Sequence, residues 1–463
     1  MLNWIWLAFL LIAVLVGGFN GKLPDLTKGA FETAETAVMK IALPLIGLMA
    51  IWLGIMRLAE RSGLVQIIAR GLKPLMRRLF PDVPPEHPAM GAMVMNMAAN
   101  MLGLGNAATP LGLRAMTYLE KLNPTPGTAT NAMCTFLAIN TASIQLLPTM
   151  AISQLALAGS QNPTAIVPAA FLATCCAAFS GVFTAKLLER LPMFRLDAPA
   201  AVKAEVQTDE TALPEEQTSI EQVTAPPLTR FGRICLLLLM LAFAAMFFCI
   251  AFPTTVNQLL AALHTGLAVP PPPAEIASKG PVLRSLSAIS VLAVPFLLAF
   301  FPLYAALRGV KVYEQFVEGA KEAFGVAQRI VPFLVAMLVA VRMLREAGVI
   351  DLVTRGLRPM LDFIGFPADL LPMVLMRPLS GSATQGIFVE LINRVGPEMG
   401  PDSLVSRMAA TIYGSTETTF YVLAVYFGSV AVRKTRHAVL AGLTADTVAV
   451  IASIAICRLM FKA

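Results

Sequence analysis

Two short stretches place small polar side chains inside segments that are otherwise apolar. The first runs from Gly103 to Gly112 (GLGNAATPLG) and the second from Arg377 to Gly386 (RPLSGSATQG). Each lies between apolar pieces of roughly 10 to 14 residues, which are too short to cross a bilayer singly and therefore predict re-entrant helical hairpins. Backbone groups at the tip of such a hairpin need water, protein or solute as partners. The tips are therefore candidate binding elements.

The apolar segment after each hairpin is also interrupted. Polar residues break it at Ala138–Pro148 (AINTASIQLLP) and again at Gly414–Thr419 (GSTETT). Broken membrane helices present half-helix ends and free carbonyls at mid-membrane, where repeat transporters bind solutes and ions. The predicted substrate-binding residues are the polar ones of the two tips and the two breaks: Asn106, Thr109, Asn140, Thr141, Ser143, Gln145, Ser382, Thr384, Gln385, Ser415, Thr416, Glu417 and Thr418.

Glu417 is the most informative of these residues. An ionisable group beside Tyr413, Phe420 and Tyr421 is costly within a membrane unless it faces a cavity or a partner. We therefore expect Glu417 to contact the solute or to carry a coupling ion, H+ or Na+. Arg377 is either its partner or an anchor for lipid headgroups. Taken singly, the small and hydroxylated residues fit close helix packing or hydrogen bonds to the preceding turn equally well.

The amino-acid composition indicates where in the cell the protein is located. Hydrophobic residues make up 57% of the 463-residue chain and charged residues only 14%. Several windows of about 20 residues are almost free of charge, which indicates a polytopic protein embedded in a lipid bilayer. The net charge of +7 does not indicate a nucleic-acid partner, because the basic residues lie at the ends of apolar spans. The six cysteines form no CxxC pair and are interpreted as packing residues.

A duplicated segment shows how these elements are organised. Arg57–Met76 (RLAERSGLVQIIARGLKPLM) aligns without a gap with Arg342–Leu361 (RMLREAGVIDLVTRGLRPML). Duplicated halves in an apolar chain are typical of transporters built from two repeats around a central site. Apolar spans follow in the same order in both halves: 3–19, 40–56, 129–157 and 164–186, then 283–307, 329–345, 408–431 and 438–460. The predicted fold is an all-α polytopic membrane protein with two inverted repeats, each holding a re-entrant hairpin and a broken transmembrane helix.

Two segments of different character join the halves. The predicted division is repeat one over 1–194, an acidic flexible cytoplasmic linker over 195–229, a connecting transmembrane helix with a Pro-rich outer loop over 230–282, and repeat two over 283–463. The linker is rich in acids, Ala, Pro, Thr and Gln, and such a composition cannot bury enough apolar surface to become ordered.

Charged loops predict the orientation of the halves. The loop from Arg57 to Lys121 has eight Lys and Arg residues against four acids, which favours the cytoplasm. The link at 158–163 is uncharged, whereas its counterpart in the second half carries Arg433, Lys434 and Arg436. The halves are therefore predicted to be inverted, with the N-terminus and the linker in the cytoplasm and the C-terminus outside. The expected location is the inner membrane of a bacterium.

The motifs of both halves resemble known membrane proteins. Half one, with FPDVPPEHPAMG, GLGNAATPLG and FLAINTAS, is similar to spore maturation protein A. Half two, with FVEGAKEAF, RPLSGSATQG and GSTETTFYVLAVYFGSVAV, is similar to spore maturation protein B. The chain thus resembles a fusion of two members of the nucleoside-recognition or Gate family, which also includes the concentrative nucleoside transporters and the Gate region of the bacterial ferrous-iron transporter.

The first hairpin tip departs from the pattern of those nucleoside transporters. Their tip resembles Gly-Gln-Thr-Glu-Ala-Pro and is followed by an Asn-Phe-Ser-Ser-like break. The matching positions here are Gly105–Pro110 (GNAATP) and Asn140–Ser143 (NTAS). The resemblance implies that the tip carboxylate holds ribose hydroxyls, and that carboxylate is missing here. The family name therefore implies a ligand that these residues do not themselves demonstrate.

Three hypotheses about function follow. The first is a secondary transporter or facilitator of a small polar solute, nucleoside-like compounds included, held between the hairpin tips. The second is a membrane receptor or structural component that has the same fold and moves nothing. The third, an enzyme, is disfavoured because the chain has no Walker loop and no H-E-x-x-H or paired-carboxylate motif. We expect no cofactor and no metal, and we expect a homo-oligomer.

Overall fold

The computed structural model describes residues 2–103, 105–194, 226–262, 280–349, 365–394 and 399–461, with the single residues 352, 356, 359, 361 and 396. Every element named in these ranges is a helix, and they contain no strand. This confirms the predicted all-α class. Most of the acidic linker, the Pro-rich loop at 268–274 and part of the duplicated segment at 342–361 lie outside the described residues.

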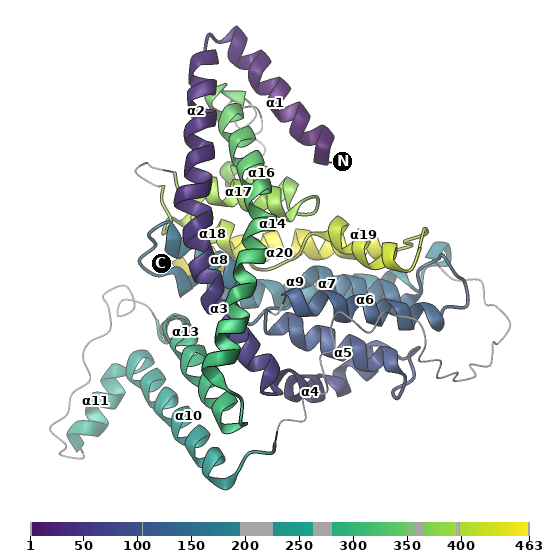
Figure 1. The fold of residues 1–463 in the computed structure, drawn as a ribbon, viewed down its shortest axis with the longest axis vertical. Coiled ribbons are helices and arrows are strands. Elements are labelled where there is room, and N and C mark those ends of the chain that lie inside the picture. The colour runs from purple at the N-terminus through teal and green to yellow at the C-terminus, as the bar shows by residue number, and fades with distance from the viewer. Residues whose placement is uncertain are drawn as a thin grey trace.

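The described helices are named in chain order (Figure 1). Those of half one are α1 (Leu2–Phe19), α2 (Leu23–Thr36), the π-helical turn η1 (Ala37–Ala42), α3 (Leu43–Arg61), α4 (Leu64–Leu79), α5 (Pro88–Met101), α6 (Gly105–Lys121), α7 (Asn131–Ala142), α8 (Thr149–Leu157), η2 (Pro163–Ile166), α9 (Val167–Leu188) and η3 (Pro192–Phe194). Two helices follow the linker, α10 (Arg230–Ala251) and α11 (Pro253–Ala262). Half two contains α13 (Pro281–Leu307), α14 (Val312–Glu346), η4 (Ala368–Leu370), α16 (Leu371–Met376), α17 (Gly381–Ile392), α18 (Leu404–Tyr413), α19 (Thr419–Ser429) and α20 (Ala438–Phe461).

Several helices have the length and the hydropathy of membrane spans. Among the described residues, five stretches qualify: Leu23–Arg61, Pro163–Leu188, Arg230–Ala251, Pro281–Leu307 and Ala438–Phe461. The number is six if the two parts of α14, which are bent by 43° at residues 329–330, are counted as one span. The protein is therefore a multi-pass membrane protein.

Two long helices form an antiparallel pair (Figure 1). One is the continuous helix of 39 residues made by α2, η1 and α3, and the other is α14 with 35 residues. The start of α14 packs on the end of α3, where Gly319 lies against Gly54 and Arg57. The end of α14 packs on α2, where Gly29 lies against Glu346. At about 1.5 Å per residue, both helices are longer than the roughly 30 Å hydrocarbon core of a bilayer.

Both long helices begin earlier than the sequence predicts. The predicted spans 40–56 and 329–345 are parts of these helices, which begin 17 residues earlier, at Leu23 and Val312. Charged pairs on one helix face, such as Lys321 with Glu318 at 2.6 Å, support the additional turns. Because these turns are polar, a search for apolar runs misses them.

The two halves share one core. The largest cluster of buried side chains joins α5, α6 and α7 of half one with α19 of half two. In this cluster, the rings of Phe136 and Tyr426 stack with 6.2 Å between their centroids. At the edge of the cluster, the backbone N–H of Arg433 donates to the carbonyl of Gly127 at 2.9 Å. Each half therefore completes the packing of the other.

Candidate functional site

The two broken helices cross at their breaks. Residues 143–148 separate α7 from α8, and residues 414–418 separate α18 from α19. The backbone N–H of Glu417 donates to the carbonyl of Thr141 at 2.7 Å, which joins the two breaks directly. Backbone groups freed by one break are thus satisfied by the other, as a buried irregular segment requires.

The broken helices run in opposite directions. At one end, the loop after α19 is hydrogen-bonded to the loop before α7, as described above. At the other end, Asp402 before α18 accepts hydrogen bonds from Ser160 Oγ at 2.7 Å and from the N–H of Gln161 at 2.8 Å, both after α8. Burial raises the pKa of Asp402, but these hydrogen bonds and Arg407 outweigh burial and leave that pKa below its ordinary value. An ionised carboxylate therefore ties these loops together.

Each hairpin tip contacts the break of its own half. Hairpin one (α5 and α6) accepts a hydrogen bond at the Met101 carbonyl from the N–H of Leu146 at 2.9 Å. Hairpin two (α16 and α17) accepts one at the Pro378 carbonyl from the N–H of Phe420 at 3.0 Å. Gly381 at the start of α17 also lies against Thr418, because a Cβ on this glycine would be 2.9 Å from the threonine Oγ1. Both tips and both breaks are thus connected through backbone groups.

Asn140 is the best connected of the predicted residues. Its Oδ1 accepts hydrogen bonds from Asn100 Nδ2 at 2.9 Å and from the Tyr426 hydroxyl at 3.2 Å, and its Nδ2 donates to the Phe136 carbonyl at 2.9 Å. The side chain is buried and holds α5, α7 and α19 together. In the state that the structure describes, Asn140 is a structural residue.

Thr141, Ser143 and Gln145 follow one another along the first break. The Thr141 hydroxyl is fully buried and has no hydrogen-bond partner among the described residues. Ser143 adopts a left-handed conformation with φ of 39°, which ends α7, and its carbonyl accepts a hydrogen bond from Thr174 Oγ1 at 3.2 Å. Gln145 is half-buried, and its Nε2 lies 3.4 Å from Ser143 Oγ and 3.4 Å from Glu417 Oε1. This glutamine links the two breaks.

The predicted residues of the hairpins take different positions. The side chain of Asn106 lies outside the described residues, and Thr109 is half-buried on α6. On α17, Ser382 is half-buried and the Thr384 hydroxyl donates to a carbonyl one turn earlier at 2.7 Å. Gln385 is buried, and its Nε2 has no partner in the part of the chain that the structure describes. Gln385 therefore brings an unsatisfied polar group of hairpin two into the interior.

The second break is more polar than the first. Ser415, Thr416 and Thr418 are buried, and the Ser415 hydroxyl donates to the preceding turn at 3.1 Å. Glu417 is half-buried, and Gln145 approaches its carboxylate at 3.4 Å, which is long for a hydrogen bond to an ionised group. Among the described residues, Glu417 is thus not fixed by a short charge-assisted hydrogen bond.

Arg377 clamps the tip of hairpin two to α18. Its side chain is only 5% exposed, so it does not reach lipid headgroups. Nη2 donates to the Tyr413 carbonyl at 2.9 Å, and the guanidinium lies 5.0 Å from the centroid of the Tyr413 ring. The ion pairs of the described residues do not include one between Arg377 and Glu417. Neither of the two roles predicted for Arg377 matches this position.

Asp446 is a site residue that the sequence analysis missed. It lies on α20 with 5% of its surface exposed, and its Oδ2 accepts a hydrogen bond from Thr419 Oγ1 at 2.6 Å. Its Oδ1 has no hydrogen-bond partner within the described ranges. Arg377 and Glu417 are close enough for their charges to act on this carboxyl. The signal was available, since an acid inside an apolar span indicates function or a buried partner.

A small cavity lies beside the tip of hairpin one. Its volume is about 160 Å³, and its lining includes Trp52 and Leu53 of α3, Gly103 of the tip and Ser153 of α8. The indole N–H of Trp52 donates to Ser153 Oγ at 3.0 Å. The cavity is mainly apolar and separates α3 from the hairpin tip.

The crossing can bind a proton, a cation or a hydroxylated solute. It combines Glu417 of the second break, Asp446 of α20, the buried guanidinium of Arg377 and the unsatisfied hydroxyl of Thr141. Within the described ranges, no three His, Cys, Asp or Glu side chains gather as metal ligands.

Comparison with known proteins identifies relatives of both halves. A family model described as Gate, nucleoside recognition, matches residues 42–156 and 327–433. Spore maturation protein A of Bacillus subtilis (strain 168) is 44% identical over 174 residues, which are 38% of this chain and 88% of that protein. Spore maturation protein B of the same strain is 43% identical over 173 residues, which are 37% of this chain and 95% of that protein. The two similarities cover separate halves.

No solved structure gives a significant match. The chain therefore belongs to the nucleoside-recognition (Gate) family of membrane proteins, as a fusion of a half similar to spore maturation protein A with a half similar to spore maturation protein B.

Proposed function

We propose that this protein is a secondary transporter or facilitator in the inner membrane that holds a small polar solute between its two hairpin tips. The observation that carries this proposal is the crossing of the two breaks, where Glu417 is hydrogen-bonded to Thr141. Unsatisfied polar groups of both halves are buried around this point. Buried polar groups without partners are costly, so a chain retains them where a ligand completes their hydrogen bonds.

The directions of equivalent helices support an inverted repeat. The broken helices are antiparallel, and so are α3 and α14. For the last helix of each half, His437 before α20 contacts Phe194 after α9 with 5.6 Å between ring centroids, so α20 begins where α9 ends. Opposite directions of equivalent elements are what an inverted repeat requires. In this proposal, residues 1–194 and 283–463 are the repeats, and the N-terminus is cytoplasmic.

The acids have separate roles in the proposal. Glu417 is half-buried and loosely held, so it is suited to bind the solute or a coupling H+ or Na+. Asp446 is more deeply buried and is held by Thr419, so it is suited to set the electrostatic field at the crossing. The solute class is hydroxylated and small, and nucleoside-like compounds belong to it.

A receptor or structural component that transports nothing is the second candidate. One observation favours it: the polar atoms of Asn140 are satisfied by protein groups, so this residue offers nothing to a solute in the described state. A transporter of the same fold would have to release some of these bonds when solute binds.

Flux measurements distinguish the two candidates. Purified protein in proteoliposomes is given a proton or sodium gradient and a panel of labelled nucleosides and small polyols. We expect gradient-dependent uptake of at least one solute, its loss in Glu417→Gln and partial retention in Glu417→Asp, because Gln keeps the shape and removes the charge. Glu314→Gln, an exposed acid on α14, is the matched control. If the folded wild-type protein moves no solute of the panel, the receptor reading is favoured. If Glu417→Gln transports like the wild type, Glu417 is not the coupling acid.

A further inference from the structure

Each half has one acidic and one basic residue at two equivalent positions. The signs of the two charges are exchanged between the halves. In the duplicated segment, Glu60 of α3 corresponds to Arg345 of α14. The second helix of each hairpin begins with a glycine, and nine residues further on stand Arg114 of α6 and Glu390 of α17. Each half therefore has one acid and one base at these two places, on the long helix and on the hairpin.

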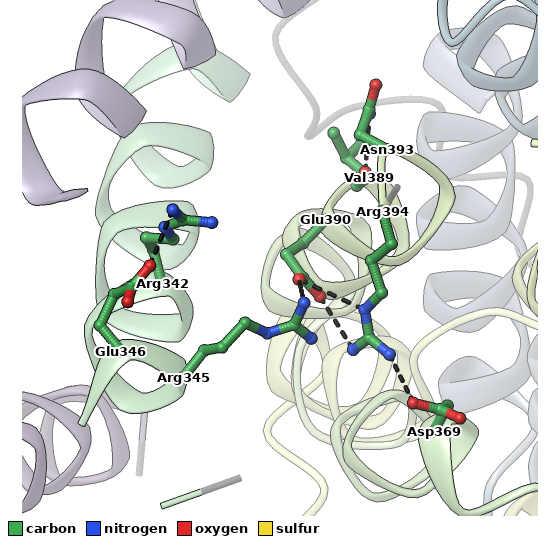
Figure 2. A network of polar contacts seen from close by, with 8 residues as sticks. All are labelled: Arg342, Arg345, Glu346, Asp369, Val389, Glu390, Asn393 and Arg394. Atoms are coloured by element: carbon green, nitrogen blue, oxygen red, sulfur yellow. Dashed lines mark hydrogen bonds and ion pairs between the residues drawn. The ribbon is translucent and has the colours of Figure 1, made fainter. Parts of the chain in front are cut away.

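In half two the pair is formed. Figure 2 shows Arg345 reaching from α14 to the carboxylate of Glu390, where the two side chains make an ion pair. Glu390 also accepts hydrogen bonds from Arg394 of the same hairpin, at 3.4 Å from Nε and 3.1 Å from Nη2, and Arg394 is paired with Asp369. The side chains of Arg345 and Glu390 are 26% and 13% exposed. We name the Arg345–Glu390 ion pair the outer latch.

Hairpin two is also packed closely on α14. A Cβ on Gly386 of α17 would lie 3.1 Å from Met337 Cβ and 3.7 Å from the backbone nitrogen of Leu338. A residue without a side chain thus lets the two helices approach. The outer latch lines a cavity of about 980 Å³ together with Leu338 and residues of α2. The latch and the Gly386 contact hold hairpin two on the long helix.

In half one the corresponding pair is not formed in the described structure. Glu60 is paired with Arg57 of its own helix at 3.5 Å, and Arg114 is exposed, with its Nε donating to the Tyr118 hydroxyl at 3.2 Å. Such pairs within one helix are weak and are easily exchanged. The α3 residues that correspond to Met337 and Leu338 are Trp52 and Leu53, which line the cavity of about 160 Å³ beside hairpin one.

We propose that Glu60 and Arg114 form a second, inner latch, and that the two latches close alternately. The tips and breaks of both hairpins are joined by the hydrogen bonds described above, whereas α3 and α14 pack on each other as a separate antiparallel pair. The hairpins with the breaks form one group, and α3 with α14 forms the other. If the two groups move so that hairpin one docks on α3, hairpin two is pulled away from α14. The described structure has the outer latch closed. The inference rests on the proposed function, since an alternation of this kind is what transport requires.

Cross-linking of introduced cysteines tests the inner latch without any solute. Full-length protein with its six native cysteines replaced carries the pair E60C/R114C and is treated with a short bis-maleimide in liposomes. We expect slow cross-linking, accelerated about fivefold or more when R345E opposes Glu390 and opens the outer latch. K321E makes the same change of charge at an exposed position of α14 and is the matched control. R345K keeps a positive charge opposite Glu390 and should leave the rate at that of the starting protein.

The reciprocal experiment uses the pair R345C/E390C. E60R, which opposes Arg114, should accelerate this cross-link, and E60R/R114E should restore the original rate. The proposal is overturned if E60C/R114C never cross-links, if R345E and K321E have equal effects, or if R345K accelerates the cross-link as much as R345E. If the cross-links alternate in a protein without measurable flux, the two latches are supported and only the proposed transport function is refuted.

Discussion

Thr419→Val probes the hydrogen bond that holds Asp446 at the crossing. Valine keeps the size of threonine but removes the hydroxyl that donates to Asp446 Oδ2 at 2.6 Å. Thr419 is fully buried and Asp446 is 5% exposed, so water does not replace the lost donor without rearrangement. A buried acceptor that is left without its donor costs about 1–3 kcal/mol. We therefore expect the free energy of unfolding to fall by about 1–3 kcal/mol.

The assay is equilibrium unfolding in mixed micelles for the wild type, the two single variants Thr419→Val and Asp446→Leu, and the double variant. Since the two side chains are in contact, their effects should be coupled by about 0.5–3 kcal/mol. Thr447→Val is the matched control on α20, because its hydroxyl is exposed and donates to its own helix at 2.8 Å. Its effect should stay within about 0.5 kcal/mol.

Two outcomes would refute this reasoning. The first is a Thr419→Val protein as stable as the Thr447→Val control. The second is strict additivity of Thr419→Val and Asp446→Leu, which would mean that the hydroxyl and the carboxyl group do not interact in the native protein.

Two further predictions concern topology and pH. A reporter fused within 205–221 should be cytoplasmic and one at the C-terminus should be outside, as judged by paired phosphatase and fluorescent-protein fusions; the same side for both would contradict inversion. Burial, with Arg436 and Lys186 nearby, lowers the pKa of His437 from 6.5 to about 4. The unfolded chain therefore takes up a proton between about pH 6.5 and 4 that the folded chain does not, and stability should fall as the pH drops through this window. His437→Gln should lose this part of the pH dependence in thermal unfolding scans, and an unchanged profile would show that His437 does not titrate in this way.

The sequence predicts the polar breaks better than the helices around them. A Gly-Ser-Thr-Glu-Thr-Thr run inside an apolar segment is visible without any structure, and α18 and α19 are indeed separated at 414–418. The added length of α14 is not visible, because its first turns are stabilised by charge pairs and by packing on Arg57 rather than by an apolar run.

Contacts between residues of the two halves also could not be predicted from the sequence. The residues around Asn140 in the sequence do not indicate that Tyr426 of the other half donates a hydrogen bond to its side chain. The sequence therefore could not show whether Asn140 binds solute or has a structural role. Arg377 illustrates the same limit, since its partner is a backbone carbonyl, and backbone acceptors leave no mark in a residue pattern. Asp446 differs, because the rule that identified Glu417 applies equally to an acid inside the last span.

The shared crossing has a consequence for the biogenesis of the chain. Gln145 and its partner Glu417 are separated by 272 residues. At a synthesis rate of about 5–20 residues per second, roughly 15–50 s pass between synthesis of the first break and synthesis of the second. During that time the Thr141 carbonyl and the polar groups around it need temporary partners, from water at the insertion site or from an insertase. Biogenesis of this protein should therefore pass through a half-inserted intermediate whose lifetime is set by the ribosome, and slowing translation after the linker should increase its degradation.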